Sequence, residues 1–284
     1  VDTLDILLGS GNDRFQVQGT SPGTVTNLYT GAGDDVIDIF NADRSLDDVQ
    51  GTLNIDAGTG RNMLNVDDSG DPDGDASIVL TSSSISGMAP GRITYGADGG
   101  DFTGGITLWG GSGGNSIEVT STLKEGGILT VTTFNTGTGN DDVTVNLDAS
   151  VDGFFVLNTQ DGDDTVDASA SSLPLVIFGG DGDDSITGGS GGDIIFGDRG
   201  RVTYGSGNGL PTTVLGNGTP IAGVIRDDSE DHLASRAVVL DGQVSNGETY
   251  VIEIWQGVIL VARASHTVTD DAAETLESIA GSLA

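Results

Sequence analysis

Residues 179–196 consist of two nine-residue units in tandem, with no residue between them. In each unit glycine occupies positions 1, 2 and 4, aspartate occupies position 6, and a bulky apolar residue occupies position 8. Glycine adopts positive φ without strain, so the start of the unit favours a turn, and the apolar residue favours a short strand after it. One unit cannot bury its apolar side chain alone, so the repeat constrains the chain to stack successive units.

A looser form of the same turn recurs along residues 9–168. Glycine stands two residues after the first turn position, Asp or Asn stands four residues after it, and apolar residues follow at six and eight. The turn positions are Gly9, Gly31, Gly58, Gly111, Gly137, Gln160 and Gly180, at intervals of 22, 27, 53, 26, 23 and 20 residues. Apolar residues two apart line one face of a strand. The spacing therefore predicts an all-β, parallel β-solenoid of about eight coils over residues 1–200, stacked about 4.8 Å apart.

The handedness and the long interval follow from the same pattern. Parallel crossovers are right-handed by strong preference, so we expect a right-handed β-helix or β-roll. The interval of 53 residues has the length of about two coils, and Ser77–Thr81 and Arg92–Tyr95 are candidate strands of a coil that lacks the turn motif. An antiparallel β protein is the alternative, but it does not need the same turn chemistry at every second corner.

The charge of the chain limits its partners. The formal net charge is −33, from 43 acidic and 10 basic residues, and only seven of the acidic residues are glutamate. Aspartate is favoured in turns and in calcium loops. Such a charge repels nucleic-acid phosphates and anionic membranes and attracts divalent cations. Intrinsic disorder also fits a charged chain of low hydrophobicity, but the regular apolar alternation favours a folded one.

Several kinds of segment are absent from the sequence. There is no cysteine, so disulfides and thiolate metal sites are excluded. No apolar run is long enough for a membrane span, and no signal peptide begins at Val1. Because no initiator Met is present, we expect the sequence to be a fragment of a longer protein.

The sequence changes in character near residue 200. Residues 201–230 are rich in Gly, Pro, Asn and Thr and show no sustained alternation, which predicts a cap or linker. Residues 231–284 predict a small α+β module for stacking or spacing. Its expected strands are 236–241, 249–255 and 258–264, and its expected helix covers 271–283, where Asp271 and Glu274 have the spacing of a capping box.

Carboxylates at the fourth position after the turn glycine predict a metal site. Calcium binds six to eight oxygen atoms from carboxylates and carbonyls, which one turn cannot supply but two stacked turns can. Aspartates fall at this position on successive coils at Asp141, Asp164 and Asp184, with Asp163 and Asp183 beside them. The turn that contains Gly189, Gly191 and Asp193 follows half a coil later, on the expected opposite edge, and Asp198 comes after it.

The tandem units resemble the hemolysin-type (RTX) calcium-binding repeat, Gly-Gly-x-Gly-x-Asp-x-apolar-x. The close match covers residues 179–200, and a looser match covers 9–168. The resemblance implies a right-handed β-roll, calcium between successive turns and a secreted bacterial protein. Carried onto this chain, the ligands are the aspartates Asp184 and Asp193 and carbonyls near Gly180, Gly182, Gly189 and Gly191.

The chain also departs from the repeat. Val202 stands where the next unit needs aspartate, so the tandem run ends there. Asn62 and Asn115 replace the carboxylate in the first half, where neutral amides are expected to form a ladder as in a metal-free solenoid. Calcium is therefore expected mainly over residues 160–200.

Residues 67–75 contain acidic side chains at every second position, as at the start of an EF-hand loop. However, Ser82 occupies the twelfth position, where a bidentate glutamate belongs, and no helices are expected beside it. A solvated insertion is the favoured interpretation of this segment, and a calcium loop is the alternative.

Catalytic residues are poorly represented. The two histidines, His232 and His266, fit surface positions better than a general base, and no nucleophile–histidine–acid or zinc hydrolase pattern is present. We therefore expect a non-catalytic, calcium-binding structural or adhesive module of a large secreted or cell-surface bacterial protein, with neighbouring domains of that protein as partners. The alternative is a β-helix that binds or modifies polysaccharide, with Lys124 and Tyr95 as the nearest candidates for a base.

Overall fold

The computed structural model describes residues 2–125, 128–197, 202–204, 211–214, 249–256 and 259–267. The chain divides into two compact units, Val1–Gly197 and Asp198–Ala284. Within the described residues every regular element is a β-strand, and no helix there is long and apolar enough to cross a membrane.

One sheet of the first unit has ten strands, in the order β1-β3-β5-β9-β8-β7-β11-β15-β17-β19. Their bounds are β1 Thr3–Ser10, β3 Val25–Ala32, β5 Thr52–Asp56, β9 Ile93–Gly96, β8 Ser84–Ser86, β7 Ile78–Thr81, β11 Ser116–Val119, β15 Asp142–Val145, β17 Thr165–Asp167 and β19 Ser185–Thr187. Neighbouring strands are parallel, except that β8 is antiparallel to both β7 and β9.

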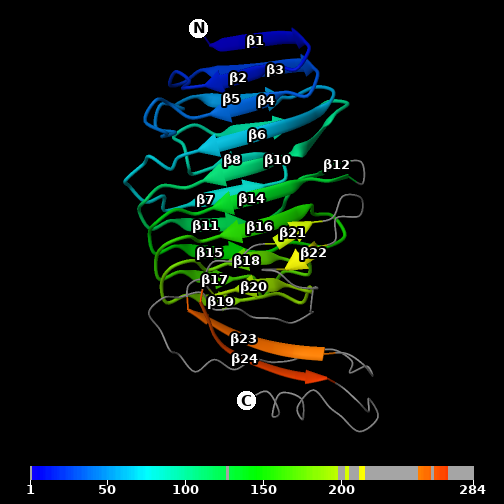
Figure 1. Ribbon diagram of the computed structural model, residues 1–284. Coiled ribbons are helices and arrows are strands. Elements are labelled where there is room, and N and C mark those ends of the chain that lie inside the picture. Colours follow the sequence, from blue (N-terminus) through cyan, green and yellow to red (C-terminus); the bar gives the residue numbers. More distant parts are fainter. Residues whose placement is uncertain are drawn as a thin grey trace. The chain divides into compact units, whose positions relative to one another are not determined.

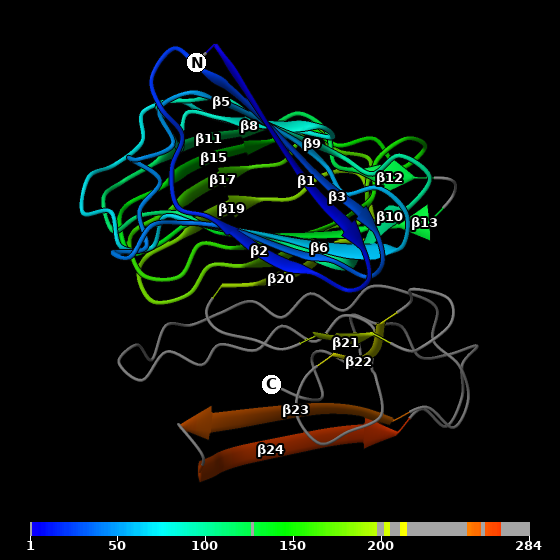
Figure 2. The ribbon, with the colours of Figure 1, turned by 90° about the horizontal axis from the view of Figure 1, so that it is seen from above.

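The other sheet has eight strands, all parallel, in the order β2-β4-β6-β10-β14-β16-β18-β20. Their bounds are β2 Arg14–Val17, β4 Val36–Ile39, β6 Arg61–Asp67, β10 Asp101–Trp109, β14 Val131–Asn135, β16 Phe154–Asn158, β18 Val176–Phe178 and β20 Ile194–Phe196. The short strands β12 Lys124–Glu125 and β13 Ile128–Leu129 pair antiparallel with each other. Figure 2 shows the two sheets facing each other, with β11, β15, β17 and β19 on one side and β2, β6 and β20 on the other.

The chain alternates between the two sheets along most of the first unit (Figure 1). We call a strand of the ten-stranded sheet, together with the strand of the eight-stranded sheet that follows it in the chain, a coil. The expected all-β class with mainly parallel strand pairing is confirmed.

Apolar side chains alternate along the strands and fill the space between the sheets. In the eight-stranded sheet one column of paired residues consists of Val66, Leu108, Phe134, Leu157 and Ile177, each 0% exposed. Fully burying side chains of this kind stabilises a fold by about 1.5–3 kcal/mol each. Because these residues pair in register, the column also fixes the heights at which the turns on either side stack.

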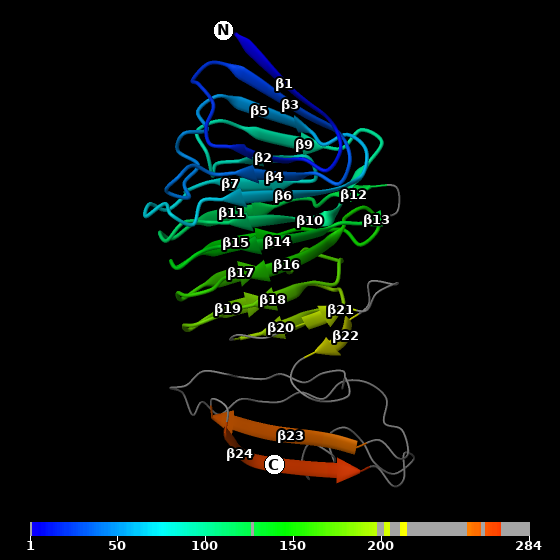
Figure 3. The ribbon, with the colours of Figure 1, turned by 45° about the horizontal axis from the view of Figure 1, so that its top comes forward.

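The segment between β6 and β10 differs from the sequence prediction. Ser77–Thr81 and Arg92–Tyr95 do overlap strands, β7 and β9 (Figure 3). Both strands, however, lie in the same sheet, joined through the antiparallel strand β8. The register places Leu80 beside Ile85 and Ile85 beside Ile93. The ten-stranded sheet therefore has two strands more than its partner, and the interval of 53 residues does not hold two regular coils.

The turn motif changes from one edge of the sheets to the other across the interval of 53 residues. The turns that begin at Gly9, Gly31 and Gly58 lead from the ten-stranded to the eight-stranded sheet. The turns that begin at Gly111, Gly137, Gln160 and Gly180 lead in the opposite direction. The prediction that all seven turns share one equivalent position is therefore wrong, because the turn at Gly58 follows a strand of the ten-stranded sheet, β5, whereas the turn at Gly111 follows a strand of the eight-stranded sheet, β10.

The second unit contains two described strand pairs. Strands β21 Val202–Tyr204 and β22 Pro211–Val214 are antiparallel, as are β23 Thr249–Gln256 and β24 Ile259–Thr267. The strands expected at 249–255 and 258–264 correspond to β23 and β24. The strand expected at 236–241, the helix expected at 271–283 and most of 201–230 lie outside the described residues.

Candidate metal centre

Stacked turns form two columns, one on each edge of the facing sheets. The first column contains the turns that begin at Gly9, Gly31 and Gly58, and the second contains those that begin at Asp71, Gly111, Gly137, Gln160 and Gly180. We number the residues of each turn by their distance from its first residue, so that the Asp or Asn of the motif stands at position four.

The turns of the second column lie directly on one another. A Cβ added at Gly137 would lie 1.7 Å from the carbonyl oxygen of Gly111, and one added at Gly180 would lie 1.6 Å from that of Gln160. Both glycines also have positive φ, +116° and +106°. The glycines of the repeat are therefore needed both for the turn conformation and for the close approach of neighbouring coils.

Side chains at position four connect each turn of this column to the next. In each case the backbone N–H donates to the side-chain Oδ1 of the residue at position four in the next coil. The donor and acceptor pairs are Asp75 to Asn115 at 2.9 Å, Asn115 to Asp141 at 2.7 Å, Asp141 to Asp164 at 2.8 Å and Asp164 to Asp184 at 3.1 Å. An unpaired buried N–H costs free energy, so this ladder stabilises the stack without any metal. Asn115 accepts as well as the aspartates do, which confirms that amides join the ladder.

A second ladder runs on the solvent side in the opposite direction. At position three, the N–H of Asp163 donates to Oδ1 of Asn140, and the N–H of Asp183 donates to Oδ1 of Asp163, each at 3.0 Å. These residues are exposed, whereas Asp141 and Asp164 are buried. Position three thus faces solvent, and position four faces the interior of the turn column.

The second carboxylate oxygens of this column are not satisfied in the same way. Oδ2 of Asp164 and Oδ2 of Asp184 are buried and have no hydrogen-bond partner, and the same holds for Asp35 in the first column. Asp141 differs, because its Oδ2 accepts the hydroxyl of Thr136. A buried carboxylate oxygen without a partner is costly, and a proton, a bound water molecule or a cation can satisfy it.

Burial shifts the ionisation of these groups. Desolvation raises the pKa of Asp141 and Asp164 above the usual range, and it raises the pKa of Asp184 to about 6. The negative charges of Asp163, Asp164 and Asp183 add to the rise at Asp184. Excess negative charge and low solvation therefore coincide where the stacked turns meet.

Threonines before the turns explain which oxygen lacks a donor. Thr136 and Thr159 each stand one residue before a turn of the second column. The Thr159 hydroxyl lies near Asp164 and lowers its pKa, but it donates to the carbonyl oxygens of Phe178 and Gly179, at 3.3 and 2.5 Å. Asp164 therefore keeps a free Oδ2 beside that hydroxyl.

The equivalent position in the next coil is Gly179, which has no hydroxyl to offer. A Cβ built on Gly179 would lie 2.3 Å from Oδ2 of Asp184 and 2.1 Å from the carbonyl oxygen of Gly197. A carboxylate oxygen and a carbonyl oxygen thus converge beside a glycine, with no donor at Asp184 Oδ2. Carboxylate and carbonyl oxygens are the ligands that calcium takes in proteins.

The structure places the predicted ligands on both edges. Asp141, Asp164, Gly180, Gly182 and Asp184 lie in the second column, whereas Gly189, Gly191 and Asp193 lie between β19 and β20 on the other edge. There both oxygens of Asp193 accept backbone N–H groups, from Leu175 at 2.9 Å and Gly189 at 2.8 Å. Asp198 lies outside the described residues.

No three acidic or histidine side chains within the described ranges already form a metal-binding group. An ion in the second column would therefore take part of its ligands from carbonyls and from side-chain rearrangement. Sequence reasoning identified the aspartates of this column but not Thr136 and Thr159, although their position directly before the turn is visible in the repeat.

The structure places segment 67–75 in a stacked turn, whereas the sequence favoured a solvated insertion. Its residues Asp71–Asp75 form the first turn of the second column, because a Cβ on Gly111 would lie 2.6 Å from the Asp71 carbonyl oxygen. The N–H of Ser112 donates to the same oxygen at 2.8 Å. Aspartates stand where the other turns have glycine, so the glycine motif did not identify this segment.

Comparison of the chain with protein families, curated proteins and solved structures found no match.

Proposed function

We propose that residues 1–197 form a right-handed parallel β-solenoid that binds calcium in the second turn column, between the coils of Asp141, Asp164 and Asp184. The observation that carries this proposal is the pair of buried, unpartnered Oδ2 atoms on Asp164 and Asp184 in adjacent coils. Carbonyl oxygens near Gly180 and Gly182 would complete the coordination. The resemblance of residues 179–200 to the hemolysin-type repeat supports the same choice of ion.

Calcium fits this set of oxygens better than magnesium does. Calcium accepts six to eight oxygen ligands in flexible geometry, whereas magnesium demands a near-ideal octahedron with short bonds. Stacked turns offer carbonyls and carboxylates at spacings set by the sheets, and the sheets cannot contract around a smaller ion. On the other edge Asp193 already accepts two N–H groups, so it supports its turn and is a weaker candidate ligand.

The role that we infer for such a module is structural or adhesive, as a rigid part of a large extracellular bacterial protein. A ligand that binds only the folded state at 100 times its dissociation constant stabilises that state by about 2.7 kcal/mol. Extracellular calcium modules work at dissociation constants on the order of 0.1–1 mM. Calcium would thus favour folding outside the cell. Its positive charge would also reduce the repulsion within a folded chain of net charge −33.

Thermal unfolding with calcium and with excess chelator tests this function. We expect calcium to raise the melting temperature of the chain and the Asp164→Asn and Asp184→Asn variants to lose most of that rise. Both variants keep an Oδ1 acceptor for the ladder, so they remove charge with little change of shape.

Asp183→Asn is the matched control, because Asp183 is the exposed neighbour of Asp184 and loses the same charge. It should keep most of the response to calcium, because Asp183 acts on Asp184 only through its charge. A melting temperature that is identical in calcium and in chelator contradicts calcium binding, and an equal loss in Asp183→Asn contradicts the assignment to the second column.

A further inference from the structure

A second acidic site lies where the chain leaves β6. Asp68 is 1% exposed, and its Oδ2 is buried without a hydrogen-bond partner. Its Oδ1 accepts the N–H of Leu46 at 2.6 Å, and its own N–H donates to the carbonyl oxygen of Trp109 at 2.9 Å. The carboxylate is thus held in place from two directions while one oxygen stays unsatisfied.

Three other carboxylates lie close enough for their charges to act on Asp68. The negative charges of Asp75, Asp71 and Asp47 act on Asp68, and those of Asp71 and Asp47 act on Asp75. Asp71 and Asp75 are half-buried and Asp47 is exposed, so the group extends from the buried Asp68 to solvent at Asp47. These residues come from two separate segments, 46–47 and 68–75.

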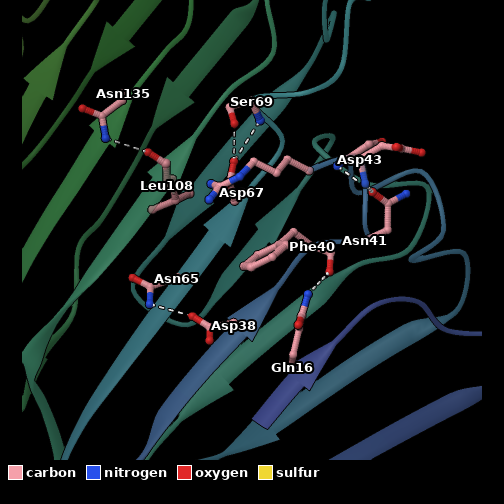
Figure 4. A network of polar contacts seen from close by, with 12 residues as sticks. Gln16, Asp38, Phe40, Asn41, Asp43, Asn65, Asp67, Ser69, Leu108 and Asn135 are labelled. Carbon is pink, nitrogen blue, oxygen red and sulfur yellow. Dashed lines mark hydrogen bonds and ion pairs between the residues drawn. The ribbon is translucent and has the colours of Figure 1, made fainter. Parts of the chain in front are cut away.

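Positive charge does not compensate this group. Among the described groups that shift the pKa of Asp68 or Asp75, none is basic. Arg44 is close in the sequence, but its guanidinium pairs with Asp67 and lies over the ring of Phe40. Figure 4 shows Asp67 beside Ser69, whose backbone N–H and hydroxyl donate to Oδ1 of Asp67.

We propose that Asp47, Asp68, Asp71 and Asp75 form a divalent-cation site of the calcium type, separate from the coils of Asp141, Asp164 and Asp184. In the absence of an ion the side chains do not converge as a three-ligand group. Binding therefore requires Asp71 and Asp75 to rotate toward the fixed Oδ2 of Asp68, and their partial exposure leaves room for this. The cation would join segment 46–47 to the first turn of the second column.

A cation meets the needs of this group better than a proton does. A proton satisfies Oδ2 of Asp68 alone and leaves three neighbouring carboxylates to repel one another. A divalent ion satisfies Oδ2 and neutralises its neighbours at the same time, and hard carboxylate oxygens are its preferred ligands. Because protons and the ion compete for the same oxygens, binding should weaken as the pH falls.

Terbium luminescence tests the site, because Tb³⁺ takes oxygen ligands as calcium does and is excited by a nearby indole. Trp109 is one backbone hydrogen bond from Asp68, and energy transfer falls steeply with distance. We expect excitation of the wild-type chain to give terbium emission that calcium displaces. Trp109→Phe should abolish the emission, which shows that it arises at this tryptophan and not at Trp255.

Asp68→Asn should abolish the emission, and the Asp71→Asn, Asp75→Asn double variant should do so as well. Circular dichroism melts of both variants establish that they are folded. The Asp164→Asn, Asp184→Asn double variant should retain the emission, so that this site and the second column are separated. Emission that is absent from the wild type, that survives Asp68→Asn in a folded chain, or that disappears only with the Asp164 and Asp184 changes overturns the site.

Discussion

Replacing Asp68 with asparagine should stabilise the metal-free chain, although the residue is almost completely buried. Asparagine keeps the Oδ1 acceptor for the N–H of Leu46. Its amide NH₂ group takes the place of the unpartnered Oδ2, beside the carboxylates of Asp71 and Asp75, where a donor is favourable. The substitution thus removes a buried charge and preserves the contact that connects segment 46–47 to β6.

The size of the effect follows from the ionisation of Asp68. Burial raises its pKa from the ordinary 3.8 to about 7, and the charges of Asp75, Asp71 and Asp47 add to the rise. One pKa unit corresponds to about 1.4 kcal/mol, so ionising Asp68 in the folded chain costs about 4 kcal/mol before screening. The exposed rim at Asp47 admits solvent, which reduces the expected cost to about 2 kcal/mol.

The sign of the pH dependence is fixed by the direction of this shift. The folded-state pKa lies above the unfolded-state value, so the group contributes most stability when it is protonated. That contribution is complete below pH 3.8 and is lost as the pH rises through about 7. The advantage of asparagine over aspartate should therefore be close to zero at about pH 4 and should reach about 2 kcal/mol by about pH 8.

Urea unfolding in excess chelator, followed by circular dichroism at a series of pH values, measures this difference. Asp73→Asn is the matched control, because Asp73 is exposed, lies in the same segment and does not shift the pKa of Asp68. It should show no comparable growth of stability with pH. A gain for Asp68→Asn that does not change with pH, or a loss of stability at pH 8, refutes the reasoning about the buried charge.

Two further pairs of alanine substitutions test the core and the turn column by thermal melting. Phe134→Ala removes a 0% exposed ring from the apolar column and should cost about 3–5 kcal/mol, whereas Val131→Ala on the same strand, 37% exposed, should cost less than about 1 kcal/mol. Gly180→Ala should destabilise far more than Gly11→Ala, because both glycines have positive φ but only at Gly180 does the new Cβ meet a neighbouring turn, at Gln160. Equal losses of stability in Gly180→Ala and Gly11→Ala would show that stacking adds nothing to the requirement for glycine.

The strand positions were largely predictable from the sequence because apolar residues alternate around a recurring turn. Leu108 and Phe134, each three residues before a turn, do lie beside each other on neighbouring parallel strands. Strand direction within the segment of residues 77–95 was not predictable. Alternation marks the buried face of a strand but carries no information on whether the next strand continues the coil or turns back.

The second column was predictable only in part, for a related reason. Asp141, Asp164 and Asp184 follow the motif and were found from it, whereas Asp71–Asp75 has aspartates in place of the turn glycines. Asp68 and Leu46 are 22 residues apart and share no motif, and only the folded coils bring them into contact. Residues joined by such contacts cannot be paired from a repeat pattern that locates one turn at a time.

The distribution of Asp and Asn at position four follows from the two separate uses of the side chain. Oδ1 accepts the N–H of the neighbouring coil, and an amide does this as well as a carboxylate does, as at Asn62 and Asn115. Oδ2 takes no part in the ladder, so an aspartate is needed in place of asparagine only where this second oxygen binds a partner. Where a threonine supplies a hydroxyl, as at Asp141, the oxygen is satisfied within the protein. Where no hydroxyl reaches it, as at Asp184, the carboxylate has no function in the ladder that asparagine would not perform. The calcium ion that we propose would give its charge a function.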